Sequence, residues 1–550
     1  MPKTKTIPLF ACLLFVIVFM LYIPFGFKNL PQMEEWGILR YYDQYKQFIH
    51  PHSFTFLRPF YDIPFKISYL ISPDTLIGFN IFQALLLFVK GICIFGIVYL
   101  LSDGDDILSA AIALLAAFFS GDKGLFSFRT INHLMSSILF LMAFYIILYM
   151  WVKRKTTAFL IILFLILINF SIGINESSIP LFFFMPLILL WKEKGVTKRL
   201  IKFFALWYLS IIPLLAFIYI PNLLNTPFAG TYQSESLALD NSLSAIINSI
   251  INACKINLIH GWRVRTTLLN LDTSSIFFSL SILAAILTLG FFFLSDTSQK
   301  GSLNKPKLFN IEFALIGLII IVLGFLPFAV TRFRYDQWRV YFLTSFGAAV
   351  VVVNISLLFL KAITKNRVWL LSILVGVLIF TSIYSLFIQQ DIFVESSNIL
   401  KRLTADISRQ APEFKQGTYI IIINMPKIND YIKKTYFRYQ FIDNFLSYIY
   451  QDYNNVLEVD FCDLSEDGKL YSEIDYHLSE YICAQGNLAV PHDSVLIFTY
   501  KEDIGFDLIQ KIPENMILQD KGWEFYNPNR LIDFSSEIPI RARKTVSIRE

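Results

Sequence analysis

The segment Gln32-Met33-Glu34-Glu35-Trp36-Gly37 lies in a polar loop between two long apolar segments, near 7–27 and 76–101. A helix that crosses a bilayer needs about 20 apolar residues, and both flanking segments are long enough. The loop, residues 24–75, therefore presents an acidic pair directly after a predicted membrane span. The sequence Leu57-Arg58-Pro59 adds a cation before the second span.

The composition is that of a membrane protein. The 550 residues are 55% hydrophobic and only 16% charged, and they include 55 Phe and 27 Tyr. Soluble domains carry about a quarter of charged residues. The net charge of +5 comes from basic residues in short clusters between apolar segments, which does not favour nucleic-acid binding. We therefore expect an α-helical polytopic membrane protein.

About eleven transmembrane helices are predicted. The first apolar segment follows Lys3 and Lys5 and has no evident small-residue cleavage site after it, so we interpret it as an uncleaved span rather than a signal peptide. The third and sixth segments are short. The predicted spans lie near 7–27, 76–101, 107–121, 133–152, 157–173, 178–191, 203–221, 276–294, 310–331, 341–360 and 368–388.

The basic residues predict an orientation. With eleven spans, the Lys- and Arg-rich loops all fall on one side, and such loops are typically cytoplasmic. The opposite side receives the 24–75 and 221–275 loops and everything after Gln389, so we expect chemistry or recognition there. The basic loop residues are Lys153, Arg154, Lys155, Lys192, Lys194, Lys198, Arg199, Lys202, Lys300, Lys305, Lys307, Lys361, Lys365 and Arg367.

The chain divides into a transmembrane domain, 1–388, and a C-terminal domain, 389–550. In the C-terminal part, 392–407 is typical of an amphipathic helix, and 429–450 is aromatic-rich and helix-like. Three short segments have strand patterns, which predicts a small extracytoplasmic α/β domain. These segments are 419–423, 495–500 and 523–526.

The cysteines do not form a metal-binding pattern. Cys462 and Cys483 lie in the C-terminal domain and could pair in an oxidising compartment, or remain two separate thiols. No CxxC motif or Cys/His cluster is present.

Glu34 and Glu35 are the first candidates for chemistry. A carboxylate near the outer membrane surface can take a proton from a hydroxyl, or hold a divalent cation such as Mg²⁺ or Mn²⁺ against a phosphate. The alternative is a solvated loop with ordinary surface acids. Arg58 is biased toward an extended backbone by Pro59 and could grip a phosphate with two hydrogen bonds. Its alternative is a cation that reaches toward lipid headgroups.

The segment Thr331–Arg339 is the strongest basic cluster on the predicted outer side. Arg332, Arg334 and Arg339 break the charge asymmetry of the loops and suit a lipid-linked phosphate or pyrophosphate. Binding of anionic headgroups without chemistry is the alternative.

Further candidates are weaker. Asp122, Lys123 and Arg129 lie in the second outer loop, where a solvated turn is the alternative. Lys90 lies inside the second span, past its middle; an ion there is a functional candidate, but its ammonium could also extend to the cytoplasmic side. The sequence also offers Asn175-Glu176, Arg263 and Arg265 as polar candidates on the predicted outer side, with a weaker indication of function.

This layout resembles the GT-C superfamily of membrane glycosyltransferases, which includes protein O-mannosyltransferases and lipid A aminoarabinose transferases. Members use polyprenyl-phosphate sugars and place an acidic residue of the first outer loop at the active site, often Asp. The resemblance implies a GT-C-like fold and gives Glu34 or Glu35 the role of base or metal-holding acid. It is carried by Glu34-Glu35, Arg58-Pro59, Asp122, the arginines of 332–339 and the C-terminal domain.

The resemblance implies a glycosyltransferase of the cell envelope. It would move a sugar from a polyprenyl-phosphate donor to a lipid, glycan or protein acceptor outside the cell membrane, inverting the anomeric centre, with 28–75 as its catalytic loop. Two alternatives stay open. An oligosaccharide polymerase or ligase would rely on arginines and the 221–275 loop without the early acids. A lipid-linked glycan transporter would carry ionisable residues deep inside several spans.

Overall fold

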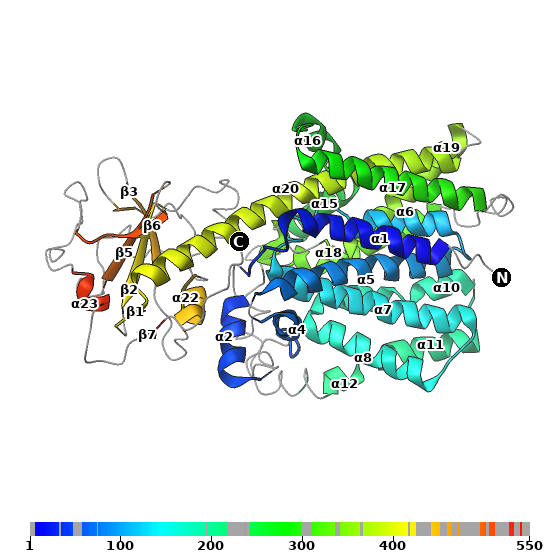
Figure 1. Ribbon diagram of the computed structural model, residues 1–550. Helices are drawn as coiled ribbons and strands as arrows, with labels where there is room; N and C mark the ends of the chain where they lie inside the picture. Colours follow the sequence, from blue (N-terminus) through cyan, green and yellow to red (C-terminus); the bar gives the residue numbers. More distant parts are fainter. Residues whose placement is uncertain are drawn as a thin grey trace.

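The structure is a computed structural model, and it is mostly helical with a small mixed sheet near the C-terminus (Figure 1). It describes residues 6–31, 35–47, 58–73, 75–193, 195–216, 220, 237, 242–298, 311–335, 341–363, 367–415, 418–424, 442–450, 459–464, 470–471, 495–501, 505–511, 527–532 and 540–541.

Each of the eleven predicted spans is wholly or largely helical in the described residues. The described residues include the short 3-10 helices η1 (Ile23–Phe25), η2 (Phe128–Thr130), η3 (Glu176–Ser178), η6 (His260–Trp262) and η7 (Arg332–Tyr335). The α-helices of the bundle are α1 (Thr6–Tyr22), α2 (Glu35–Tyr45), α4 (Ile63–Ile71), α5 (Ile77–Leu101), α6 (Asp106–Ala117), α7 (Ile131–Lys153), α8 (Ala158–Ile174), α9 (Ile179–Phe184), α10 (Leu187–Glu193), α11 (Lys198–Leu209), α12 (Ile212–Leu214), α15 (Leu243–Leu258), α16 (Val264–Leu269), α17 (Ile276–Ser298), α18 (Ile311–Ala329), α19 (Thr344–Ile363) and α20 (Arg367–Gln410).

Six of these helices are long and apolar enough to cross a membrane, and a seventh span results if the bent pair α8 and η3–α10 is counted as one. The chain is therefore a multi-pass membrane protein, and the part that the structure describes has six or seven candidate spans, fewer than the eleven predicted. Length explains the difference. The 12 residues of α6 cover about 18 Å, well short of a hydrocarbon core of about 30 Å. All of α6 is nevertheless buried, because α5 and α19 enclose it.

Two of the basic residues, Lys192 and Arg199, lie at one end of the bundle. Lys192 Nζ donates hydrogen bonds to the carbonyl oxygens of Leu100 (3.1 Å) and Leu101 (2.8 Å), and Arg199 Nη2 donates to that of Met150 (3.2 Å). Helix α1 begins at this end as well (Figure 1). We refer to it as the basic end, and to the opposite end, from which α20 continues, as the outer end. That the basic end faces the cytoplasm stays a prediction.

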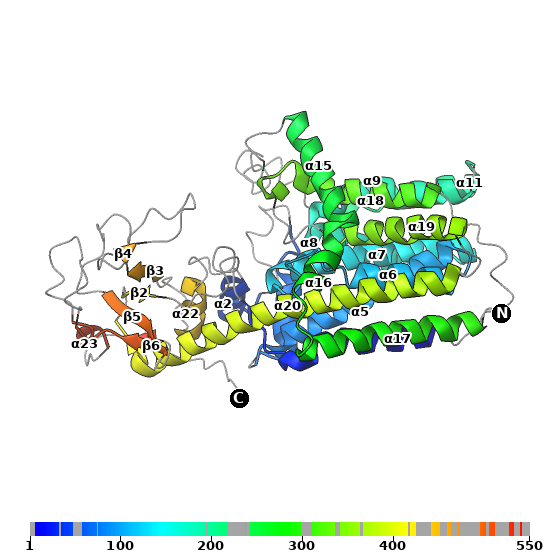
Figure 2. The same ribbon diagram turned by 90° about the horizontal axis from the view of Figure 1, so that it is seen from above.

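Helix α20 joins the bundle to the C-terminal region. Its 44 residues include both the predicted span at 368–388 and the predicted amphipathic helix at 392–407, so the division predicted at 388/389 falls within one helix. Figure 2 shows α20 running along the bundle and on to the sheet.

The C-terminal sheet has the strand order β4-β3-β2-β5-β6. Strand β2 (Tyr419–Ile423) is parallel to β3 (Val459–Leu464) and β5 (Val495–Lys501), whereas β4 (Leu470–Tyr471) and β6 (Gly505–Leu508) are antiparallel edges. All five residues of β2 are buried, as expected for a central parallel strand. A separate pair joins β1 (Glu413–Phe414) to β7 (Ile540–Arg541), and α22 (Ile442–Tyr450) and α23 (Asn529–Ile532) complete the region.

The predicted strands at 419–423 and 495–500 are confirmed. Of the predicted helix at 429–450, α22 is the described part. The predicted strand at 523–526 lies outside the described residues, as does Cys483, so the disulfide stays a prediction.

Side chains of α20 cover the exposed edge of the sheet. Asp406 Oδ2 accepts a hydrogen bond from the backbone N–H of Phe506 (3.0 Å), and Gln410 Oε1 accepts one from Leu508 (2.7 Å). Gln410 Nε2 donates to the Phe506 carbonyl oxygen (2.6 Å). Because an unpaired edge strand can pair with other chains, these contacts both anchor the sheet and protect it.

Helix α2 of the first outer loop lies between the bundle and the C-terminal region, where it packs against α22 (Figure 1). The Trp36 ring lies 4.4 Å from that of Phe445 and 5.3 Å from that of Tyr448, between ring centroids. The Tyr69 hydroxyl of α4 donates to Asp43 Oδ1 (3.1 Å). These contacts hold α2 on both sides.

Candidate functional site

Glu35, the second residue of the acidic pair, opens α2. Glu35 is the first residue of that helix and is completely buried, so the alternative of a solvated surface acid is wrong for this residue. A carboxylate in the first turn is favoured by the positive end of the helix dipole. Its burial beside Trp36 removes it from bulk water, where a carboxylate is costly to keep charged. Glu34 lies outside the described residues.

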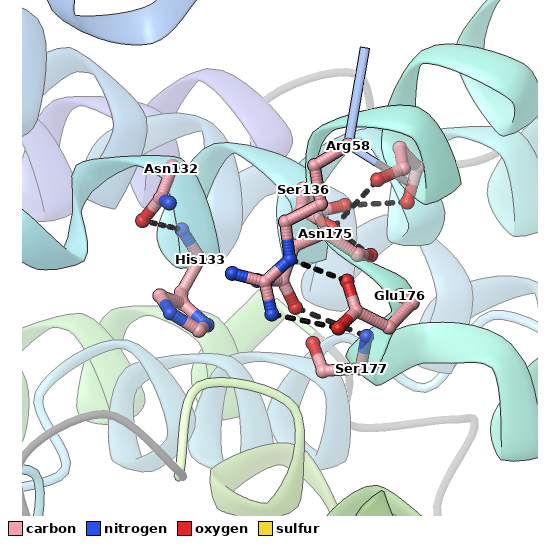
Figure 3. A network of polar contacts seen from close by, with 8 residues as sticks. Arg58, Asn132, His133, Ser136, Asn175, Glu176 and Ser177 are labelled. Atoms are coloured by element: carbon pink, nitrogen blue, oxygen red, sulfur yellow. Dashed lines mark hydrogen bonds and ion pairs between the residues drawn. The ribbon is translucent and has the colours of Figure 1, made fainter. Parts of the chain in front are cut away.

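Arg58 is held by a carboxylate of its own chain. Its Nε lies 2.6 Å from Glu176 Oε2 and its Nη2 lies 2.7 Å from Glu176 Oε1, a bidentate ion pair (Figure 3). The backbone N–H of Phe60 donates to the Gly173 carbonyl oxygen (3.0 Å), which fixes the loop against the end of α8. Arg58, predicted to grip a substrate phosphate, thus has one face occupied by Glu176.

A buried polar network surrounds this pair (Figure 3). Ser136 Oγ donates to the carbonyl oxygen of Ser171 (2.9 Å), and Asn175 Oδ1 accepts from the Ser177 N–H (3.0 Å). Within the described part of the chain, no hydrogen-bond partner reaches Asn132 Nδ2 or Asn175 Nδ2, although both are buried. Buried amide donors without a partner are costly, and they suit a site that accepts a polar ligand.

Lys90 points to the outer end, which corrects the expectation that it could extend to the cytoplasmic side. Its Nζ donates to Ser345 Oγ (3.0 Å) at the start of α19 and interacts electrostatically with Asp122. The reason is geometric. Helical side chains lean toward the N-terminus of their helix, and the N-terminus of α5 lies at the outer end. Asp122, the predicted acid of the second outer loop, is buried near this ammonium.

Lys123 lies next to a second cation. Burial, and to a lesser degree the nearby Arg263 guanidinium, lower the pKa of Lys123 to about 8. The two loops that carry them are packed closely: Ser120 Oγ donates to the Gly261 carbonyl oxygen (2.7 Å). Neither Gly121 nor Gly261 has room for a Cβ atom, since Phe119 and backbone atoms fill that space. The packing of these loops thus keeps two positive groups together.

The other predicted cations differ in their exposure. Arg332 is exposed, whereas Arg334 is buried and its Nε donates to the Thr331 carbonyl oxygen (3.3 Å). Arg129, in η2, is half-buried. Arg339 lies outside the described residues.

Helix α5 connects the first outer loop to the second. Asn80 Nδ2 donates to the Asn29 carbonyl oxygen (3.0 Å), and Gln83 Nε2, less than one turn later, donates to that of Leu125. The rings of Phe79 and Phe128 also meet, with centroids 5.1 Å apart. The start of the 24–75 loop is thereby fastened beside the loop that carries Asp122 and Lys123.

Two side-chain neighbours at the outer end were not predicted from the sequence: Glu176 beside Arg58, and Arg263 beside Lys123. Glu176 and Arg263 were recognised only as weak polar candidates, because each partner lies more than 100 residues away in the chain and no periodic pattern links them. Among the described residues, no group of three or more His, Cys, Asp or Glu side chains could hold a metal ion.

Comparison with known proteins found no match. No protein-family model and no curated protein sequence matches the chain. The resemblance to the GT-C superfamily therefore rests on the residues and layout of this chain.

Proposed function

We propose that the protein is a membrane glycosyltransferase, which moves a sugar from a polyprenyl-phosphate donor to a lipid, glycan or protein acceptor on the extracytoplasmic side. One observation carries the proposal. At the outer end of the bundle, the chain holds the buried acids Glu35 and Asp122, with Asp122 near Lys90 and with Lys123 near Arg263. Charged groups inside a membrane protein are costly and are typically retained for function.

The chemistry of the reaction matches these groups. As the bond between the sugar and the phosphate breaks, the prenyl phosphate leaves as an anion, and cations near it would stabilise that charge where water is scarce. Lys123 with a pKa of about 8 is mainly protonated at neutral pH. Glu35 takes the proton of the acceptor hydroxyl while the new bond forms on the opposite face of the sugar, which inverts the anomeric centre.

A transporter of lipid-linked glycan is the second candidate, and the buried Lys90 with its neighbour Asp122 favours it. Both candidates require an anionic, lipid-anchored substrate. They differ in whether a glycosidic bond forms.

The test supplies purified protein in vesicles with radiolabelled polyprenyl-phosphate sugars and an extract of acceptors. We expect a covalent glycosylated product, lost in Glu35→Gln and retained in Glu395→Gln, an exposed acid on α20 that serves as control. Movement of the donor across the bilayer without product would favour the transporter. Full product formation by the double variant Glu34→Gln and Glu35→Gln would reject the early acids and favour the polymerase or ligase.

A further inference from the structure

Helix α15 lies across the outer end of the bundle rather than along it (Figure 2). It packs on α18 and α19 through a buried face that includes Ser249, Ala253 and Ile256. Its other residues are half-buried or exposed, and the helix belongs to none of the candidate spans. Its exposed surface divides into two stripes of different chemistry.

The first stripe is apolar. Leu243, Ile247 and Ile251 recur every four residues, so they lie on one side of the helix. Their exposed fractions are 72%, 46% and 46%. Large aliphatic side chains so arranged in water would expose a continuous apolar strip, which a soluble surface avoids.

The second stripe is polar. Ser244, Asn248 and Asn252 follow the apolar residues by one position each and are exposed too. One position is a rotation of about 100° around a helix, so this stripe lies beside the first. An exposed surface that is half apolar and half polar is typical of a helix that lies in the plane of a membrane interface.

The helix on which α15 packs indicates what the apolar stripe contacts. Helix α18, on which α15 packs, is a candidate span, and its surface includes the exposed apolar residues Leu315, Leu318 and Ile319. Because α15 packs directly on a candidate span, lipid is the apolar environment available to its exposed stripe. The charge of this segment also favours a contact with lipid. Residues 242–265 contain Lys255, Arg263 and Arg265 but neither Asp nor Glu, which suits anionic headgroups.

We propose that α15 is an interfacial helix that binds the outer leaflet, with Leu243, Ile247 and Ile251 among the acyl chains and Ser244, Asn248 and Asn252 toward headgroups and water. Lys255, exposed at the end of the apolar stripe, extends to lipid phosphates. This inference depends on the membrane-spanning fold and is independent of the proposed enzymatic activity.

The test introduces the photoreactive residue p-benzoylphenylalanine into the full-length chain at position 247 or 251, or at position 248 or 252 as matched neighbours. The protein is placed in vesicles of phosphatidylethanolamine and phosphatidylglycerol, irradiated and analysed by mass spectrometry. Position 293 is the positive control, since Phe293 is exposed on the span α17. We expect lipid adducts at 247 and 251, several-fold more than at 248 and 252.

Three results would overturn the inference while the control at 293 reacts with lipid. One is equal lipid labelling of both stripes, and another is the absence of lipid adducts at 247 and 251. The third is cross-linking of 247 or 251 to a second copy of the chain, which would assign the stripe to a protein interface.

Discussion

Arg58 and Glu176, 118 residues apart in sequence, form a bidentate ion pair that fastens the first outer loop to the break between α8 and α9. Both side chains are only partly exposed, at 14% and 25%, so water screens the pair less than it would on an open surface. The chain changes direction by 112° at this break. The pair therefore holds the outer loop at a bend of the bundle.

We expect Glu176→Gln to destabilise the protein by about 1.5–3 kcal/mol, because it leaves a half-buried guanidinium without its carboxylate. Unfolding in mixed micelles measures this change. The double variant Arg58→Gln with Glu176→Gln should lose less than the sum of the two single variants, since the second substitution removes a group already without its partner. Strictly additive losses would show that the two side chains do not stabilise the fold through each other.

The pKa of Lys123 predicts a pH dependence. The value of about 8 lies below the ordinary 10.5, so the folded chain holds this proton less tightly than the unfolded chain. The cost of burying the cation is present below pH 8 and is relieved as the pH rises toward 10.5, so this group contributes increasing stability over that range. Chemical acetylation of Lys123, followed by mass spectrometry, should have a midpoint near pH 8.

Replacing Arg263 tests the cause of that shift. Arg263→Gln should raise the pKa of Lys123 but not restore it to 10.5, because burial is the larger cause. Arg265→Gln is the matched control, since Arg265 lies two residues further along, is exposed, and should leave the midpoint unchanged when replaced. An unchanged midpoint in Arg263→Gln would rule out an electrostatic contribution from that guanidinium.

Local pattern and long-range packing differ in what they reveal. Apolar runs correctly predicted the helical segments and the strand at 419–423, because a buried segment is itself rich in apolar residues at regular spacing. They did not distinguish α6, an enclosed helix of 12 residues, from a span. The direction of Lys90 follows from the lean of helical side chains and was accessible to sequence reasoning. The partners of Arg58 and Lys123 were not, since they depend on how distant segments pack.

Gly505 tests the attachment of the C-terminal sheet. Its φ of +97° is unfavourable for other residues, and a Cβ there would collide with the Asp406 carboxylate that receives the Phe506 N–H. We expect Gly505→Ala to cost about 1–3 kcal/mol and to accelerate proteolysis of the C-terminal region. Gly290→Ala, at a helical position with open space around it, is the control. Equal proteolysis of both variants would contradict this role of the contact between α20 and β6.

Trp36 links the candidate base to the C-terminal region. It is buried against Phe445 and Tyr448 of α22 and follows Glu35 directly, so its loss should free the start of α2. We expect Trp36→Ala to cost about 3–5 kcal/mol. If the proposed transfer is correct, kcat should fall more than the apparent affinity for the donor, because Glu35 is then poorly positioned for proton transfer. Tyr45 is an exposed aromatic residue of the same helix, and it serves as the control. Tyr45→Ala should change neither kcat nor the apparent affinity for the donor. Retention of full kcat by a folded Trp36→Ala variant would mean that α22 does not position the acid of the first outer loop.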